Sequence, residues 1–274
     1  MAPPAEQDIR VAVGGLGVIG GEVACRLDQG IPGLRLTAVA ARDLDKAHRR
    51  MAGFREAVPV VSLDALAGDA DVVVECLPAG RFTEVAFPAV RAGRIFLPLS
   101  VGALLDSPGL IDLARETGAR IIVPTGALLG LDAVRAAAEG VIHSVTMVTR
   151  KPPRGLAGAP YLIENQIRVD DLDAPLKVFE GTAREAARGF PANVNVAVAL
   201  SLAGIGPDAT MIEIWADPDV ERNTHTIRVD SDATRFEMTI EGIPSQDNPA
   251  TGMLTPLSVI ATLRGLVSPL KAGT

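Results

Sequence analysis

The first half of the chain alternates short apolar runs with longer stretches in which apolar and polar residues mix. The apolar runs predict strands, and they occupy residues 9–13, 34–41, 58–61, 71–77, 95–101 and 120–124. The stretches between them predict helices over residues 21–29, 45–51, 62–67, 82–92 and 111–118. Repeated alternation of strand and helix is typical of a parallel sheet with helices on its faces. We therefore expect residues 1–127 to form an α/β domain with a doubly wound parallel sheet.

The pattern changes in the second half, where the predicted strands are longer and alternate more clearly between apolar and polar positions. These strands occupy residues 142–149, 211–216, 224–230 and 235–241, and helices are predicted over 129–139 and 191–203. Residues 168–177 are polar and predict a loop. We expect residues 128–250 to form an α+β domain with a mixed sheet. Within residues 251–274, an apolar helix over 254–267 is expected to pack back toward the first domain.

Three glycines follow the first predicted strand and open the first predicted helix. Gly15, Gly17 and Gly20 have the spacing G-x-G-x-x-G. In this context the first glycine permits a tight turn, the second lets a pyrophosphate approach the backbone, and the third lets the helix pack closely on the strand. The N–H groups at the helix start, including those of Val18 and Ile19, would then face the phosphates. The motif predicts a Rossmann-type dinucleotide-binding domain; the alternative is a glycine turn that serves packing alone.

The ends of two further strands predict other cofactor contacts. Arg42 and Asp43 follow the second strand, where an acidic residue favours NAD and an arginine accommodates the extra phosphate of NADP. The choice between NAD and NADP stays open, as does the alternative that both side chains are solvated loop charges. Pro78 and Ala79 follow the fourth predicted strand and would run beside the ribose next to the nicotinamide. Glu75, within that apolar strand, needs a hydrogen-bonding partner if it is buried.

The composition of the 274 residues excludes several classes of partner. Hydrophobic residues make up 48% of the chain and aromatic residues 3%, and the formal net charge is −7. An acidic chain with few aromatic residues is poorly suited to binding nucleic acid. The sequence has neither a signal-peptide pattern nor an uninterrupted apolar run of about 20 residues. Cys25 and Cys76 are too few for a disulfide framework, and no cluster has metal-ligand spacing. We therefore expect a cytoplasmic protein with no metal, nucleic-acid or membrane partner.

The chain holds three histidines, the residue type best suited to exchanging protons near neutral pH. His48 lies in a charged helical stretch and is expected at the surface, whereas His143 begins a strand and is expected to be structural. His225 lies in the middle of a strand and shares its face with Asn223 and Ile227. A strand histidine is more often structural than catalytic, so the residues alone leave both roles open for His225.

Five other runs are more specific than the glycine motif. They are PTGALLGLDA over 124–133, TRKPP over 149–153, FPANVNVA over 190–197, NTHTI over 223–227, and NPATG over 248–252 with the residues through Arg264. Together they resemble L-aspartate dehydrogenases, and the similarity covers essentially the whole chain from Ile9 onward.

This resemblance implies an NAD(P)-dependent oxidation of L-aspartate to iminoaspartate, which hydrolyses to oxaloacetate and ammonia or passes into NAD biosynthesis. The family's catalytic histidine falls on His225, and its cofactor-contacting alanine and asparagine fall on Ala127 and Asn195. Asn193 is close enough to be that asparagine instead. The chain departs from the family at 128–129, where two leucines replace an isoleucine–glycine pair and remove one flexible point from the loop.

An aspartate substrate carries two carboxylates, which need cationic or hydrogen-bonding partners. Arg150 and Lys151 end a strand beside two prolines; the alternative is that they are exposed turn charges. Asn193 is a candidate to meet the cofactor or orient a water, or else it caps a helix. Thr251 is a candidate to offer its hydroxyl to a carboxylate, or else it too is a cap.

Two other functions stay open on the sequence. One is a related NAD(P)-dependent reductase of another small amino or oxo dicarboxylic acid, and the other is a dinucleotide-sensing protein without catalysis. An open sheet in the second domain needs cover, so we expect a homodimer or a higher homo-oligomer.

Overall fold

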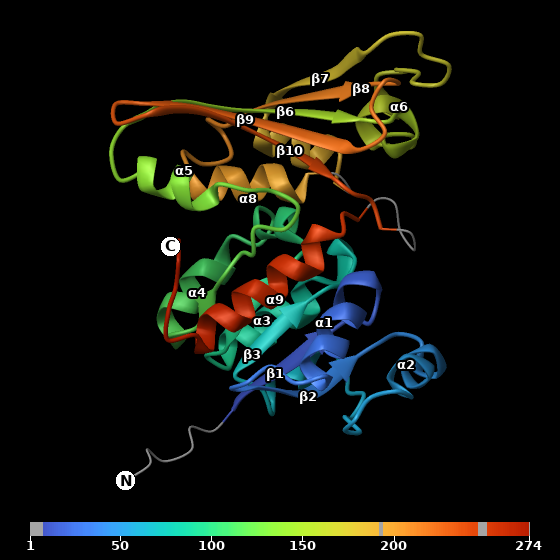
Figure 1. The fold of residues 1–274 in the computed structure, drawn as a ribbon, viewed down its shortest axis with the longest axis vertical. Helices are drawn as coiled ribbons and strands as arrows, with labels where there is room; N and C mark the ends of the chain where they lie inside the picture. The colour runs from blue at the N-terminus through green and yellow to red at the C-terminus, as the bar shows by residue number, and fades with distance from the viewer. Residues whose placement is uncertain (1–7, 192–193, 246–250, 274) are drawn as a thin grey trace. The chain divides into compact units, whose positions relative to one another are not determined.

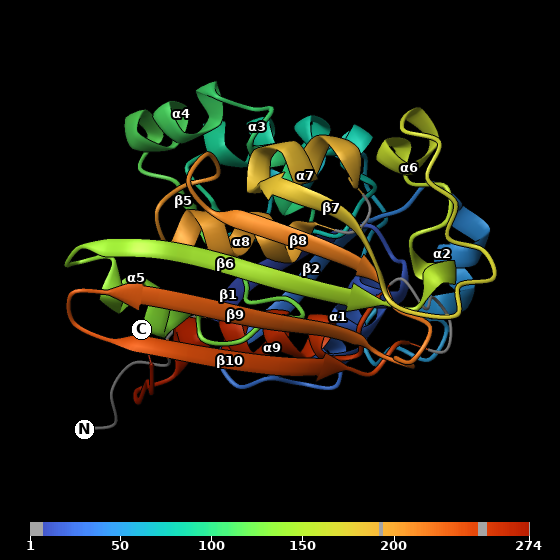
Figure 2. The same cartoon turned by 90° about the horizontal axis from the view of Figure 1, so that it is seen from above.

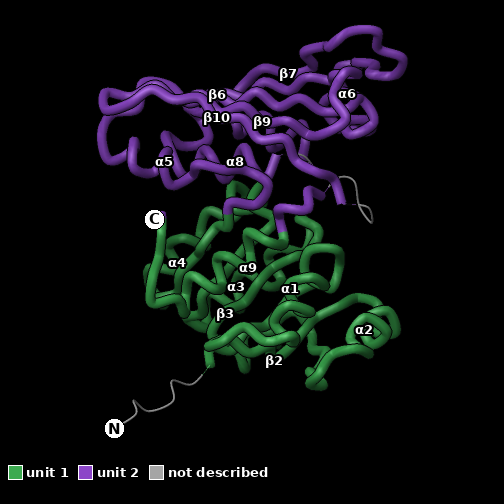
Figure 3. Tube along the Cα trace, in the orientation of Figure 1, with its two compact units in different colours: residues 1–124, 256–272 green, residues 125–255, 273–274 purple. Residues whose placement is uncertain are grey.

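The computed structural model describes residues 8–191, 194–245 and 251–273. The chain forms two compact units. Unit 1 comprises Met1–Pro124 and Pro256–Ala272, and unit 2 comprises Thr125–Thr255 and Gly273–Thr274 (Figure 3). These boundaries lie a few residues from the expected ones, which followed residues 127 and 250.

Unit 1 contains a five-stranded sheet in the order β2-β1-β3-β4-β5, in which every pairing is parallel. Its strands are β1 (Ile9–Gly14), β2 (Leu34–Ala40), β3 (Val72–Glu75), β4 (Ile95–Pro98) and β5 (Arg120–Ile121). A parallel bridge between Val39 and Val60 adds one more position outside β2. With that position included, the spatial order is that of the Rossmann fold, which confirms the expected fold class.

Helices flank this sheet (Figure 1). They are α1 (Val18–Asp28), α2 (Leu44–Met51), α3 (Thr83–Arg91), α4 (Gly109–Thr117) and α9 (Leu254–Val267), with 3-10 turns η1 (Asp64–Ala67), η2 (Ala79–Arg81) and η3 (Val101–Leu104). All four residues of β3 are buried, as is usual when helices cover both faces of a parallel sheet. Val259, Ile260 and Leu263 of α9 belong to the same apolar core as α1 and the first three strands.

Five predicted elements of unit 1 differ in length or type from what the apolar pattern indicated. The strands expected over 71–77 and 95–101 are shortened to β3 (Val72–Glu75) and β4 (Ile95–Pro98). Residues 58–61 form only the bridge at Val60, and β5 ends at Ile121 instead of residue 124. The segment 62–67 is a 3-10 turn rather than an α-helix. Proline cannot donate a hydrogen bond to a sheet, and Pro59 and Pro124 stand where the strands expected over 58–61 and 120–124 would have continued.

Unit 2 contains a five-stranded mixed sheet in the order β10-β9-β6-β8-β7, as expected (Figure 2). Its strands are β6 (Ile142–Lys151), β7 (Leu176–Thr182), β8 (Met211–Ala216), β9 (Asn223–Ser231) and β10 (Arg235–Gly242). The pairing of β6 with β8 is parallel, and the other pairings are antiparallel. The described helices of unit 2 are α5 (Leu131–Ala137), α6 (Pro160–Glu164), α7 (Ala183–Gly189) and α8 (Asn195–Ala203), with the 3-10 turn η4 (Pro153–Gly155).

One face of this sheet is a core face. Along β6 the buried residues are Val145, Met147, Thr149 and Lys151, which alternate with more exposed neighbours. Helices α5 and α8 lie under the sheet on one side (Figures 1 and 2). The alternation in β6 therefore separates an inner face, which ends in two polar residues, from an outer face of mixed character.

Candidate active site

The glycine loop follows β1 at the point where the strand order reverses between β1 and β3. Gly15 has a φ of +98°, and a Cβ there would lie 2.6 Å from the carbonyl oxygen of Cys76. A Cβ on Gly20 would lie 1.9 Å from the carbonyl oxygen of Gly15. A Cβ on Gly17 would meet nothing within 4 Å. The fold itself requires Gly15 and Gly20, whereas Gly17 leaves open space at the loop surface.

Helix α1 begins at this loop, with Gly17 as its N-cap and no acidic residue in its first turn. The first N–H groups of a helix have no partner within the helix, and they lie at the positive end of its dipole. Those of Val18, Ile19 and Gly20 are the first three in α1. The loop therefore has the geometry and the electrostatics of an anion site.

The predicted ribose contacts follow β2 and β3 at the same carboxyl edge of the sheet. Arg42 is exposed, and Asp43 caps α2 because its carboxylate accepts a hydrogen bond from the Lys46 amide at 2.9 Å. Pro78 and Ala79 lie at the start of η2. Since carboxyl ends of parallel strands share one edge, these residues flank the glycine loop.

Arg50 is a cation at the glycine loop that the sequence analysis missed. Its guanidinium donates to the carbonyl oxygen of Leu16, and to that of Gly17 at 2.7 Å. A Cβ on Gly21 would lie 2.9 Å from the same guanidinium group. The only sequence signal is the amphipathic pattern of α2, which does not reveal that the helix reaches back to the loop.

Glu75 is fully buried at the end of β3 and ties together the loops that follow β3 and β4. Its carboxylate accepts hydrogen bonds from the backbone N–H groups of Leu77 at 2.7 Å, Leu99 at 3.2 Å and Ser100 at 3.0 Å. The Ser100 hydroxyl lies 3.1 Å from it. Burial raises the pKa of Glu75, although these hydrogen bonds act in the opposite direction. Its role is therefore to hold the two loops.

His225 lies on the core face of unit 2, where only 4% of it is exposed. It stands directly opposite Thr149 in the antiparallel pairing of β9 with β6. The imidazole Nδ1 and the threonine Oγ1 are 3.0 Å apart and share a hydrogen bond. This contact fixes the ring and leaves Nε2 to face other groups. Thr149 was not singled out from the sequence, because nothing local reveals which residue pairs with a strand histidine.

Lys151 lies two residues beyond Thr149, on the same face of β6, and is 5% exposed. Burial lowers the pKa of Lys151 to about 8. The pKa of His225 is lowered to about 3, first by burial and then by the positive charge of Lys151. The core face of the sheet thus ends in a polar cluster of Thr149, Lys151 and His225.

Arg150 lies on the opposite face of β6 from this cluster. Its guanidinium lies 4.7 Å above the centre of the Trp215 ring and donates to the buried carboxylate of Asp217 at 2.8 Å. The two candidates for a substrate carboxylate, Arg150 and Lys151, are therefore separated by the strand, and the buried Lys151 is not an exposed turn charge. Adjacent residues of a strand point to opposite faces, and only Lys151 shares a face with His225.

The remaining predicted residues lie in loops or at helix starts of unit 2. A Cβ on Gly252, the neighbour of Thr251, would lie 3.6 Å from the Cβ of Ala127, so two of the sequence runs meet there. Asn195 is the first residue of α8 and is partly exposed. Asn193 lies outside the described residues. The other histidines, His48 and His143, are exposed.

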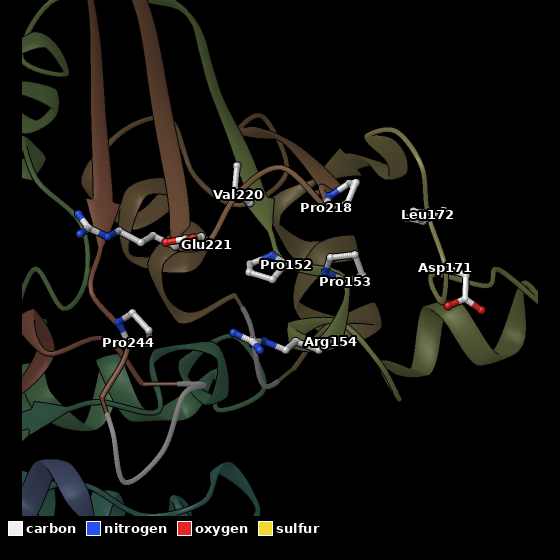
Figure 4. A pocket seen from close by; sticks show the side chains of 10 residues that line it. Pro152, Pro153, Arg154, Asp171, Leu172, Pro218, Val220, Glu221 and Pro244 are labelled. Carbon is white, nitrogen blue, oxygen red and sulfur yellow. The ribbon is translucent and has the colours of Figure 1, made fainter.

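A pocket of about 730 Å³ opens at the end of β6, next to Lys151 in the sequence (Figure 4). It is lined by residues of unit 2, namely Pro152, Pro153, Arg154, Asp171, Leu172, Pro218, Val220, Glu221, Arg222 and Pro244. Prolines make its walls rigid, and Arg154 and Arg222 bring cations to its lining. The pocket lies at the end of the sheet where β6 stops and β9 begins.

Within residues 8–191, 194–245 and 251–273, no three histidine, cysteine or carboxylate side chains are grouped so that they could hold a metal ion. Across the same residues, none of the helices has the length and apolar character needed to cross a bilayer.

Comparisons with known proteins agree with this geometry. Residues 15–124 match the NAD-binding domain of homoserine dehydrogenases, and residues 132–266 match the C-terminal domain of aspartate dehydrogenases. The L-aspartate dehydrogenase of Bradyrhizobium diazoefficiens is 57% identical, over 98% of this chain and 96% of that protein. L-aspartate dehydrogenase 3 of Bordetella bronchiseptica is 54% identical over 98% of both chains.

A solved structure extends the comparison to the fold. The crystal structure of aspartate dehydrogenase from Thermotoga maritima matches 97% of this chain and 100% of its own, with a TM-score of 0.74 and 26% identity. With relatives above 50% identity over nearly its full length, the chain belongs to the aspartate dehydrogenase family.

Proposed function

We propose that this protein catalyses the NAD(P)-dependent oxidative deamination of L-aspartate to iminoaspartate, which water converts to oxaloacetate and ammonia. The observation that carries the proposal is the buried His225, held by Thr149 on the core face of unit 2, in a chain 57% identical to an L-aspartate dehydrogenase. Iminoaspartate can also leave the enzyme before it is hydrolysed, and NAD biosynthesis is the proposed route that would use it.

The glycine loop fits the pyrophosphate of a dinucleotide. The open space at Gly17 admits a phosphate that a side chain would exclude, and the first N–H groups of α1 favour its charge. We assign Val18, Ile19 and Gly20 to the pyrophosphate. Further contacts are assigned to the ends of β2 and β3 and to two residues of unit 2, namely Arg42, Asp43, Pro78, Ala79, Ala127 and Asn195.

The chemistry divides between the cofactor and the protein. When bound, the nicotinamide accepts a hydride from Cα of the substrate. The protein must take a proton from the substrate ammonium group, because only the neutral amine can assist departure of the hydride. We assign this proton chemistry to the polar cluster that contains His225. Thr251 stays a candidate to donate its hydroxyl to a substrate carboxylate. Arg150 is no longer a candidate for binding a substrate carboxylate.

The first test is an assay for reduced nicotinamide with L-aspartate and either cofactor. We expect aspartate-dependent absorbance of the reduced ring, and His225→Ala should lower turnover on the order of 100-fold or more. Cofactor binding, followed by fluorescence, should be largely unchanged because His225 is not part of the glycine loop. Full turnover in the His225→Ala variant would contradict the assignment.

A panel of substrates separates this function from its main alternative. Because residues 15–124 match the NAD-binding domain of homoserine dehydrogenases, the panel includes homoserine with D-aspartate, L-glutamate and other small dicarboxylates. A faster reaction with one of these than with L-aspartate would favour a related reductase. Tight cofactor binding without any turnover would favour a sensing role.

The proposed setting is a homo-oligomer in the cytoplasm. Cys25 and Cys76 are both free thiols, which suits a reducing compartment. The described helices α5 and α8 lie under one face of the unit 2 sheet, and we propose that a second copy of the chain covers the other face.

A further inference from the structure

The polar cluster contains two groups that exchange protons, although the family resemblance points to one. Thr149, Lys151 and His225 are 3%, 5% and 4% exposed, so all three are withdrawn from water. They end a face that is otherwise apolar, with Met147 and Ile227 paired across β6 and β9 immediately before them. A buried lysine is costly and needs a reason.

We propose that Lys151 and His225 act as one proton-accepting pair, in which Lys151 holds the proton that leaves the substrate's ammonium group. The proposal rests on the proposed function and deepens it. His225 contacts the substrate nitrogen and Lys151 acts through it, so Lys151 is a positioning and proton-holding residue.

The pKa values of the pair support these different roles for His225 and Lys151. Burial and the charge of Lys151 lower the pKa of His225 to about 3, so the imidazole is neutral at every pH near neutrality. A group with that pKa accepts a hydrogen bond but does not keep a proton. Burial lowers the pKa of Lys151 to about 8, which places its neutral, basic form within the alkaline range.

The surroundings of the pair contain few competing charges among the described residues. Lys151 pairs with Ala216 of β8, and Ile240 of β10 stands opposite His225. Asp217 directly follows Ala216, the last residue of β8. Its carboxylate accepts hydrogen bonds from the Arg150 guanidinium and the Asp219 backbone N–H. Lys151 is thus the charge whose field depresses the pKa of His225.

In the proposed step, a substrate N–H bond breaks and its proton goes to Nε2 of His225. The imidazole gives up a proton from Nδ1 to the Thr149 hydroxyl, with which it shares a hydrogen bond, and that hydroxyl passes a proton to the neutral amine of Lys151, which becomes an ammonium. The neutral substrate amine then forms a C=N bond as the Cα–H bond breaks and its hydride reduces the bound nicotinamide. The amino acid is oxidised, the pyridine ring is reduced, and the proton on Lys151 is released to water afterwards.

The activity test compares four proteins over a range of pH. In the wild type, kcat should rise as Lys151 loses its proton. Lys151→Met should lower kcat on the order of 100-fold and abolish that rise. Lys151→Arg should be equally impaired, because an arginine keeps its proton throughout this range. Lys177→Met, at an exposed lysine paired with Glu180 on β7, is the matched control and should behave as the wild type.

A second readout needs no turnover. With 15N-labelled histidine, the signal of His225 can be assigned with a His225→Gln variant, since the chain has three histidines. In the wild type and in Lys151→Arg, His225 should stay neutral down to acidic pH. In Lys151→Met its titration midpoint should move upward, because the neighbouring positive charge is gone.

The outcomes separate the two proposals. No aspartate-dependent reduction by the wild type would overturn the proposed function, while the histidine titration would still test the pair. A raised KM for aspartate in Lys151→Met, with kcat and its pH profile unchanged, would show a lysine that binds a carboxylate and would overturn the pair. So would a His225 midpoint that does not respond to Lys151→Met.

Discussion

In the glycine loop, Gly20 is needed for the fold, whereas Gly17 is needed for ligand binding. Gly17→Ala should leave stability almost unchanged, because its Cβ would meet nothing within 4 Å. It should weaken NAD(P) binding, because the methyl group occupies the space that a pyrophosphate would use. Gly20→Ala should instead destabilise the protein by about 1–3 kcal/mol, because its Cβ would lie 1.9 Å from a backbone oxygen.

Urea unfolding and cofactor titration of Gly17→Ala and Gly20→Ala test these two predictions. The clash in Gly20→Ala outweighs the gain of about 1 kcal/mol that alanine brings to a helix interior. Unchanged cofactor affinity in a stable Gly17→Ala variant would remove the loop from the cofactor site.

The residues around His225 show which parts of the candidate site can be predicted from the sequence and which cannot. His225 was open to two roles on its own residues and became a catalytic candidate only through the resemblance. Thr149 was not found, because its contact with His225 depends on the register between β6 and β9. Arg150 and Lys151 were both candidates because they end a strand beside two prolines, although alternation in the strand places them on opposite faces.

At the scale of elements, Glu75 is the link between the ends of β3 and β4. Both carboxylate oxygens accept from backbone N–H groups, so Glu75→Gln places an amide donor against donors and should cost about 1–3 kcal/mol. The raised pKa of Glu75 means that its contribution to stability is full below its unfolded pKa and is lost as pH rises through the folded pKa. A glutamine has no such dependence.

Urea unfolding of the wild type and of Glu75→Gln at acidic and neutral pH tests the direction of this pH dependence. The stability advantage of the wild type should be larger at acidic pH, within the range where the protein still folds. An advantage that grows as pH rises would mean that the hydrogen bonds outweigh burial and that the pKa of Glu75 is lowered.

Two predicted elements have the bounds that the structure gives them. Residues 211–216, where buried and more exposed positions alternate, coincide with β8, and the apolar run over 254–267 coincides with α9. The polar loop expected over 168–177 is present up to residue 175, but the elements on either side of it, namely α6, β7 and α7, were missed. A signal was present, because Thr182 and Glu185 form a capping box at the start of α7.

At the scale of the whole molecule, the chain passes through unit 1, forms unit 2 and returns to unit 1 with α9. Composition could not show which surfaces are incomplete, because that depends on the faces left over once each sheet has been covered.

The outer face of the unit 2 sheet is such a surface. Val148 and Trp215 lie there beside cross-strand ion pairs such as Arg228 with Glu237. Val148 stands between Glu213 and Thr226, so the patch mixes apolar side chains with charges of both signs. Such a patch can be self-complementary in a two-fold contact. Light scattering should give the mass of two chains for the wild type and of one chain for Val148→Asp. Ile111→Asp, at an exposed apolar residue of α4, should remain a dimer. A wild type with the mass of one chain at micromolar concentration would show that this face is open to water in the working enzyme.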